Sequence, residues 1–157
     1  MIVRKANRDD TARIAEIERA VFSDAWSKTG IEETLDQQTS RIYVGEEENE
    51  IVGYVIAYTV LDEGEVVRIA VSSDFRRRGV AEMLLDKVIS DGKESGVCMW
   101  YLEVRESNVA AQKLYKKKGF AETGLRKDFY EKPKENAVLM NKSLETLSGV
   151  QKKHDRL

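Results

Sequence analysis

Cysteine, histidine and proline are almost absent from this chain of 157 residues. It contains one cysteine, Cys98, one histidine, His154, and one proline. A single cysteine excludes an internal disulfide and a multi-cysteine zinc site, and it suits a reducing compartment. His154 lies in a polar stretch, so histidine-based catalytic triads and histidine metal clusters are not expected. The sequence therefore predicts no metal site.

Long apolar runs and an excess of charge of one sign are also missing. No run approaches the roughly 20 residues needed to cross a bilayer, and the N-terminus MIVRKANRDD has no signal-peptide pattern. The 26 Lys and Arg residues nearly cancel the 28 Asp and Glu residues, so the chain lacks the basic excess typical of nucleic-acid-binding proteins. These absences predict a soluble cytoplasmic protein with no membrane partner and no direct nucleic-acid partner.

The chain has enough apolar residues for one well-buried core. Hydrophobic residues make up 41% of the sequence, and no internal repeat or low-complexity linker divides it. We therefore expect one α/β domain over residues 1–143, followed by a polar, flexible tail at 144–157. Cys98 lies between Val97 and Met99 in an apolar run, which predicts a buried and unreactive thiol.

The first half of the chain predicts two helices and an antiparallel meander of strands. Asn7 and the two aspartates that follow offer capping oxygens for a helix with Ile14 and Ile17 on one face. A second helix is expected over residues 28–37. Strands are expected at 2–5, 41–45, 51–61 and 65–71, the last of them after a turn at 62–64.

The second half predicts a parallel crossover, then a helix and a closing hairpin. A strand, a helix and a second strand follow one another in one short unit, so a right-handed crossover between parallel strands is expected. Asn108 and Gly119 supply the N-cap and C-cap of the later helix. The expected helices are 79–94 and 108–118, and the expected strands are 97–104, 120–130 and 137–143, the last two joined through Pro133.

The turn inside residues 67–89 is a candidate phosphate site. It joins an apolar strand to an amphipathic helix, and its glycine lets a ligand approach the unpaired amides at the helix start. An ordinary turn with solvated arginines explains the same pattern equally well. An RNA contact is a third explanation, but no aromatic residues suited to base stacking accompany the arginines. The residues concerned are Arg76, Arg77, Arg78, Gly79, Val80 and Ala81.

Three further polar residues are candidates for chemistry. Glu103 interrupts a mostly apolar strand, where it is either a base or an edge charge beside Arg105. Asn108 and Tyr115 are seven residues apart, close to two helical turns, so they share one face of a helix. From spacing alone, Asn108 is equally explained as a helix cap and Tyr115 as a core residue.

At these residues the sequence resembles a known family, the GCN5-related N-acetyltransferases (GNAT). Its acetyl-CoA signature is Arg or Gln, two residues, Gly, one residue, and then Gly or Ala, which Arg76, Gly79 and Ala81 match. The segments FSDAWS and WYLEVRESNVAAQKLYKKKGF resemble those of members that acetylate the N-terminus of a ribosomal protein. The resemblance extends over most of residues 1–143.

The resemblance implies a fold and a cosubstrate. The implied fold is α/β (α+β), a mixed, mostly antiparallel sheet whose central parallel strand pair splays apart between flanking helices. Acetyl-CoA would lie in that gap, with its pantetheine arm paired to backbone groups of Ile69, Ala70 and Val71. Amides of residues 76–81 would hold the pyrophosphate, Asn108 would contact the cosubstrate, and no metal would take part.

The resemblance also implies catalytic roles and an acceptor. Glu103 would be the general base for the acceptor amine, and Tyr115 would protonate the departing CoA thiolate. A tyrosine pKa of about 10 is close to that of a thiol, so this transfer would be roughly balanced. The implied acceptor is the N-terminal α-amine of a small-subunit ribosomal protein, held between residues 22–26 and 129–131, and a monomer is expected.

Two other functions remain open from the sequence. The cofactor half of such a fold serves many acceptors, so the substrate is alternatively a small-molecule amine or a lysine side chain. A noncatalytic acetyl-CoA-binding module is the third possibility, and the presence of both Glu103 and Tyr115 argues against it.

Overall fold

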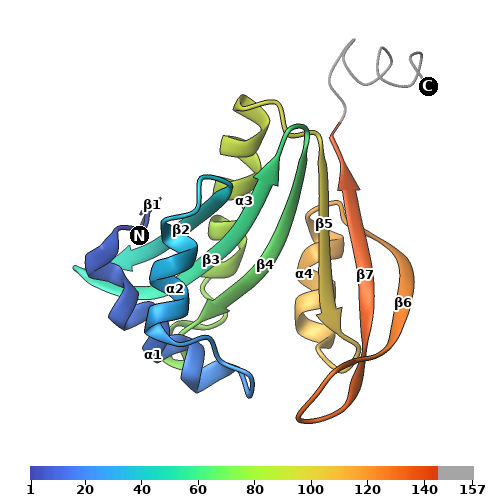
Figure 1. Ribbon diagram of the computed structural model, residues 1–157, viewed down its shortest axis with the longest axis horizontal. Helices are drawn as coiled ribbons and strands as arrows, with labels where there is room; N and C mark the ends of the chain where they lie inside the picture. Colours follow the sequence, from blue (N-terminus) through green and yellow to red (C-terminus); the bar gives the residue numbers. More distant parts are fainter. Residues whose placement is uncertain (145–157) are drawn as a thin grey trace.

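Seven strands form one mixed sheet in the order β1-β2-β3-β4-β5-β7-β6, and helices cover both of its faces (Figure 1). The computed structural model describes residues 1–144. The strands are β1 (Ile2–Lys5), β2 (Ser40–Glu47), β3 (Glu50–Val60), β4 (Glu63–Val71), β5 (Met99–Arg105), β6 (Ala121–Tyr130) and β7 (Glu135–Ser143). The helices are η1 (Arg8–Asp10), α1 (Thr11–Val21), α2 (Lys28–Leu35), η2 (Ser73–Phe75), α3 (Val80–Glu94) and α4 (Val109–Lys117).

The only parallel pair recorded in this sheet, β4 with β5, separates part of the way along. The two strands pair from Glu63 to Val66 of β4, whereas β4 stays paired with β3 as far as Val71. The β3–β4 register shifts between Ile56 and Ala57, which leaves Val67 without a partner. A bulge of this kind bends its strand and increases the local twist. Figure 1 shows the result, since β4 and β5 lie together where they begin and diverge toward their arrowheads.

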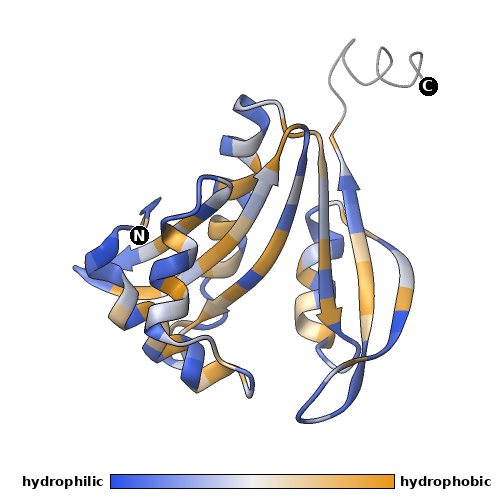
Figure 2. Ribbon diagram, in the orientation of Figure 1, coloured by the Kyte–Doolittle hydropathy of each residue, from blue (hydrophilic) through white to orange (hydrophobic). Residues whose placement is uncertain are grey.

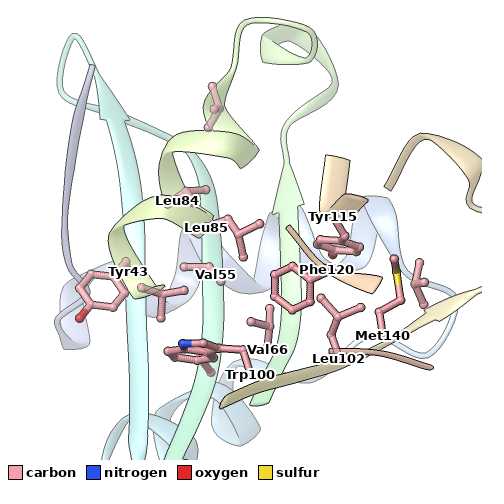
Figure 3. Close-up of a cluster of buried hydrophobic side chains, with 14 of the residues drawn as sticks. Tyr43, Val55, Val66, Leu84, Leu85, Trp100, Leu102, Tyr115, Phe120 and Met140 are labelled. Atoms are coloured by element: carbon pink, nitrogen blue, oxygen red, sulfur yellow. The ribbon is translucent and has the colours of Figure 1, made fainter. Parts of the chain in front are cut away.

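Two apolar clusters hold the helices to the sheet. The larger cluster joins α3 and α4 to one face, and Figure 3 shows Leu85, Trp100, Tyr115 and Phe120 in it. The smaller cluster joins α1 and α2 to the other face through residues such as Ile14, Ile31, Tyr54 and Ala70. Apolar residues, orange in Figure 2, are grouped along β3 and in the middle of β7. In β4, Ile69 and Val71 pack against the larger cluster and Ala70 belongs to the smaller one, so its side chains alternate between the two clusters.

Most of the expected elements and the implied fold class are confirmed. The meander, the crossover through α3, the helices and the closing hairpin all form. Asn108 caps α4 as expected, but Asn7 caps η1, and α1 has no side-chain cap. The C-cap of α4 is Lys118, and Gly119 follows it with φ of +92°. The turn before β4 is shorter than expected, because β4 begins at Glu63 and the turn is made by Leu61 and Asp62. Within residues 1–144, none of the helices has the length and apolar character needed to cross a membrane.

The expectation that Cys98 is buried is wrong. Cys98 is half-buried, because β5 begins one residue later and Cys98 lies in the segment that enters the strand. Its backbone is bonded there, since its N–H donates to Asp62 O and its carbonyl accepts from Leu144 N. His154 and the tail expected at 144–157, apart from Leu144, lie outside the described residues.

The packing around Trp100 gives a stability prediction. Gly92 is in α3, where alanine is normally more stable than glycine by about 1 kcal/mol. A Cβ at Gly92 would lie 2.5 Å from the fully buried Trp100 ring. We therefore expect Gly92→Ala to lower the free energy of unfolding by about 1–3 kcal/mol, measured by urea denaturation.

A glycine in α2 provides the matched control. A Cβ at Gly30 would meet only Ser27 Oγ, at an ordinary 3.4 Å. Gly30→Ala should therefore leave stability unchanged or raise it by up to about 1 kcal/mol. A rise of the same size for Gly92→Ala would contradict the packing described for Trp100.

Candidate active site

The separation of β4 from β5 opens a cleft with two connected parts. The inner part, a cavity of about 360 Å³, lies between Ile69 of β4 and Val104 of β5 and reaches Tyr115 of α4. The outer part, about 510 Å³, is lined by the α1–α2 loop and by the end of β6. Both parts share Arg68, Glu103 and Tyr130 as lining residues. One continuous cleft therefore passes between the two halves of the sheet.

The edge of β4 offers backbone groups to this cleft. Ser72 N donates to Val52 O at 2.8 Å, and hydrogen bonding in an antiparallel ladder alternates residue by residue. The backbone of Ala70 is therefore directed toward β3, and those of Ile69 and Val71 are directed away from it. The Ala70 side chain is buried against the α1 side of the sheet. Of the three residues implied from the sequence, Ile69 and Val71 are the ones placed to pair with a ligand.

The turn formed by Arg76, Arg77, Arg78 and Gly79, called here the arginine turn, leaves the backbone amides at the start of α3 without a side-chain cap. Gly79 has φ of +77°, Arg77 has φ of +64°, and no side chain caps the helix. A Cβ at Gly79 would have no atom within 4 Å. Val80 has its side chain in the core, so its amide is the group that it can offer to a ligand. Unpaired amides at a helix start favour an anion.

The side chains of Arg76, Arg77 and Arg78 lie around this turn and leave its backbone amides accessible. Arg76 Nε donates to Val71 O at 3.3 Å. The Arg78 guanidinium lies 5.1 Å from the Phe75 ring centroid and 4.0 Å from a carboxylate oxygen of Glu47. All three arginines are exposed, so they add positive charge to a site built from backbone amides.

Glu103 lines both the inner and the outer part of the cleft. Its side chain is 23% exposed, and one oxygen lies 3.3 Å from Arg126 Nη1. That oxygen, Oε2, is buried and has no hydrogen-bond partner among the described residues. Burial and then the charge of Glu103 raise the pKa of Tyr130 to about 12. A carboxylate with spare acceptor capacity in such a place suits an amine or a water molecule.

Tyr115 and Asn108 bring α4 to the inner part of the cleft. Tyr115 is 5% exposed, and its ring centroid lies 5.8 Å from that of Phe120. Burial, followed by the nearby Tyr130, raises the pKa of the Tyr115 hydroxyl, which therefore keeps its proton at neutral pH. Asn108 caps α4, with Oδ1 accepting from Ala111 N at 3.1 Å. Its side-chain NH₂ is the group left to contact a ligand.

The two segments expected to hold the acceptor lie on opposite walls of the outer cavity. Ser23, Asp24 and Trp26 form one wall, and residues 129–131 form the other. The sequence interpretation missed Arg68 and Arg126. Arg68 had a visible sign, because it is a charge inside the apolar run VVRIAV. Arg126 had none, since it is one of several charges along an exposed strand.

This fold and cleft define a class of protein, which sequence comparison identifies independently. The sequence model of the acetyltransferase (GNAT) family matches residues 11–120, and the chain belongs to this family. The matched range includes the arginine turn, both strands of the cleft and α4.

Within this family, the chain is similar to several acetyltransferases of ribosomal proteins. The chain is 37% identical over 142 residues to the ribosomal protein bS18-alanine N-acetyltransferase of Haemophilus influenzae, which covers 88% of this chain and 96% of that protein. It is 36% identical over 134 residues to the protein of the same name from Haemophilus ducreyi, covering 83% and 92%. The crystal structure of the ribosomal-protein-S18-alanine N-acetyltransferase from Escherichia coli matches with a TM-score of 0.86 at 26% identity, covering 92% of this chain and 94% of that chain.

Proposed function

We propose that this chain transfers the acetyl group of acetyl-CoA to the N-terminal α-amine of ribosomal protein bS18. The observation that carries the proposal is that Glu103 and the buried Tyr115 line one cleft beside the unpaired edge of β4. The names of the curated relatives support the choice of acceptor. Ribosomal proteins are synthesised in the cytoplasm, so we propose that the chain acts in that compartment. We also propose that it acts as a monomer and that its partner is a protein N-terminus and not nucleic acid.

The donor half of the cleft fits acetyl-CoA, which supplies the acetyl group as a thioester when bound. Ile69 and Val71 would pair with the amides of its pantetheine arm, as an added strand pairs with a sheet edge. The amides of Gly79, Val80 and Ala81 would hold the pyrophosphate, aided by the charge of the three arginines before them. An amide near Val71 would stabilise negative charge that develops on the thioester oxygen.

Glu103 would bind the acceptor amine and remove its proton, directly or through water. An N-terminal amine has an ordinary pKa of about 7.7–8.0, against about 10.4 for a lysine side chain. An α-ammonium group therefore gives up its proton near neutral pH to a weak base, whereas a lysine ammonium holds its proton far more strongly. Oε2 of Glu103, buried and without a hydrogen-bond partner among residues 1–144, supports this role.

Tyr115 would protonate the leaving sulfur. Its raised pKa keeps the proton on oxygen until negative charge develops nearby. A thiolate in the same buried place also loses solvation, which raises the pKa of its thiol in the same direction. The near balance expected from ordinary pKa values is therefore retained when both groups are buried, and no covalent enzyme intermediate is needed.

Acceptor choice is the experiment that tests the function. CoA release would be measured with peptides that have a free N-terminal alanine, with the same peptides N-terminally blocked but containing lysine, and with polyamines. We expect turnover with the free N-termini alone. Turnover confined to blocked lysine peptides or polyamines would refute the proposal, and tight acetyl-CoA binding without turnover would indicate a noncatalytic module.

Substitution of Tyr115 tests the proton donor. Tyr115→Phe keeps the buried ring, so we expect kcat to fall about 100-fold with little change in acetyl-CoA affinity. Because the pKa of Tyr115 is raised, the wild-type rate should increase as the acceptor amine loses its proton and should show no decline up to about pH 10. Stopped turnover assays across pH measure both effects.

Glu103→Gln is the companion variant for the base. It should lower kcat/KM for the peptide while the acetyl-CoA affinity stays near the wild-type value. Full turnover by either variant would remove that residue from the mechanism.

A further inference from the structure

A buried ionic cluster lies behind the α1–α2 wall of the cleft. Glu18 of α1 is 0% exposed, and its carboxylate contacts three parts of the fold. Oε1 accepts a hydrogen bond from the hydroxyl of Tyr54 in β3. Oε2 accepts from Trp26 N at 2.9 Å and lies 3.2 Å from Arg68 Nε in β4. A fully buried carboxylate is costly unless it is paired, so this one fixes its partners relative to one another.

Arg68 extends this cluster into the α1–α2 loop. Its guanidinium carbon lies 4.2 Å from the ring centroid of Phe22 and 5.3 Å from that of Trp26. Nη2 donates to the backbone carbonyl of Asp24 at 3.0 Å and lies 3.3 Å from its carboxylate. The side chain is only 11% exposed. One guanidinium thus contacts the loop through two rings, a carbonyl and a charge, which the compact ammonium of lysine cannot reproduce.

These two side chains bond to the loop backbone, while Phe22 and Trp26 pack against the smaller apolar cluster. In the part of the chain that the structure describes, the hydrogen bonds recorded for the backbone of residues 23–26 go to Glu18 and Arg68. The backbone bonds on either side belong to the end of α1 and the start of α2. A loop without its own backbone ladder takes the conformation that its side-chain partners impose.

Arg68 also lies at the point where the cleft opens. It follows Val67, the unpaired residue of the β4 bulge, and precedes Ile69, whose backbone faces the cleft. Of its partners, Asp24 and Trp26 line the outer cavity with Tyr130 and Glu131, and Phe22 lines the inner cavity. The donor edge and the acceptor wall are therefore joined by a single side chain.

We propose that Arg68 and Glu18 are positioning residues that hold the α1–α2 loop as the acceptor-binding wall. The pair acts on acceptor affinity and not on the chemical step. This inference rests on the proposed function for the identity of the acceptor, but the loop geometry that it describes stands independently of that identity.

Arg68→Lys tests the inference directly. It keeps the charge and removes the planar stacking, so KM for the acceptor peptide should rise about tenfold, while kcat and the KM for acetyl-CoA stay within about threefold. Amide exchange at Trp26 should become about tenfold faster, because its hydrogen bond to Glu18 loosens. Arg41→Lys is the matched control, since Arg41 is a half-buried strand arginine bonded to Thr59 that does not line the cleft.

A pair of tyrosine variants covers the case in which Arg68→Lys fails to fold. Tyr54 and Tyr43 are both fully buried, and the hydroxyl of each donates to a carboxylate, of Glu18 and of Asp91 respectively. Tyr54 does not line the cleft, so any effect on the acceptor must pass through Glu18. Tyr54→Phe should raise the acceptor KM about threefold, and Tyr43→Phe should leave it unchanged.

The outcomes separate this inference from the proposed function. The acceptor in these assays is whichever class the wild-type chain acetylates, so a lysine or polyamine acceptor would refute the proposed function while the loop is still tested. An unchanged acceptor KM in Arg68→Lys and Tyr54→Phe would overturn the inference, and so would equal effects in the Arg41 and Tyr43 controls. If no acceptor is turned over, Trp26 exchange decides, and an unchanged exchange rate in Arg68→Lys overturns it.

Discussion

The separation of β4 from β5 after Val66 is the constraint on which the rest of the structure depends. It is stable because each strand stays paired on its other side, β4 with β3 to Val71 except at the Val67 bulge, and β5 with β7 over its whole length. Beyond the bulge, the backbone groups that the separation releases are those that face the cleft. Unpaired backbone groups cost free energy when they are buried away from water. Here they stay accessible to water or to a ligand that has amides of its own.

Each wall of the cleft uses a different kind of support. The donor wall is backbone, fixed by the sheet and by the start of α3, so its side chains matter little for chemistry. The proposed catalytic groups come from β5 and α4, where Glu103 is 23% exposed and Tyr115 is buried. The acceptor wall is a loop held by the buried charges of Glu18 and Arg68. Under the proposed function, donor binding would depend on the backbone of the fold, and acceptor binding would depend on a few side chains.

The sequence predicted local features better than contacts between distant segments. Gly79 and Asn108 were recognisable because a turn or a cap leaves a mark within a few residues. The bulge at Val67 depends on pairing between strands, and nothing within VVRIAV specifies it, so the splay was expected only through the family resemblance. Cys98 was misplaced because an apolar neighbourhood does not show where a strand begins. Arg68 was missed because its partners lie 42 to 50 residues earlier in the chain.

The central claim is that the edge of β4 and the start of α3 hold the donor through their amides. Hydrogen exchange with and without acetyl-CoA measures this residue by residue. The account predicts that the cosubstrate protects the amides of Ile69, Val71, Val80 and Ala81. Ala70, bonded toward β3, and Gly96, which lies beyond the far end of α3, should exchange at unchanged rates. Tight binding of acetyl-CoA without protection at Ile69 and Val71 would contradict the account.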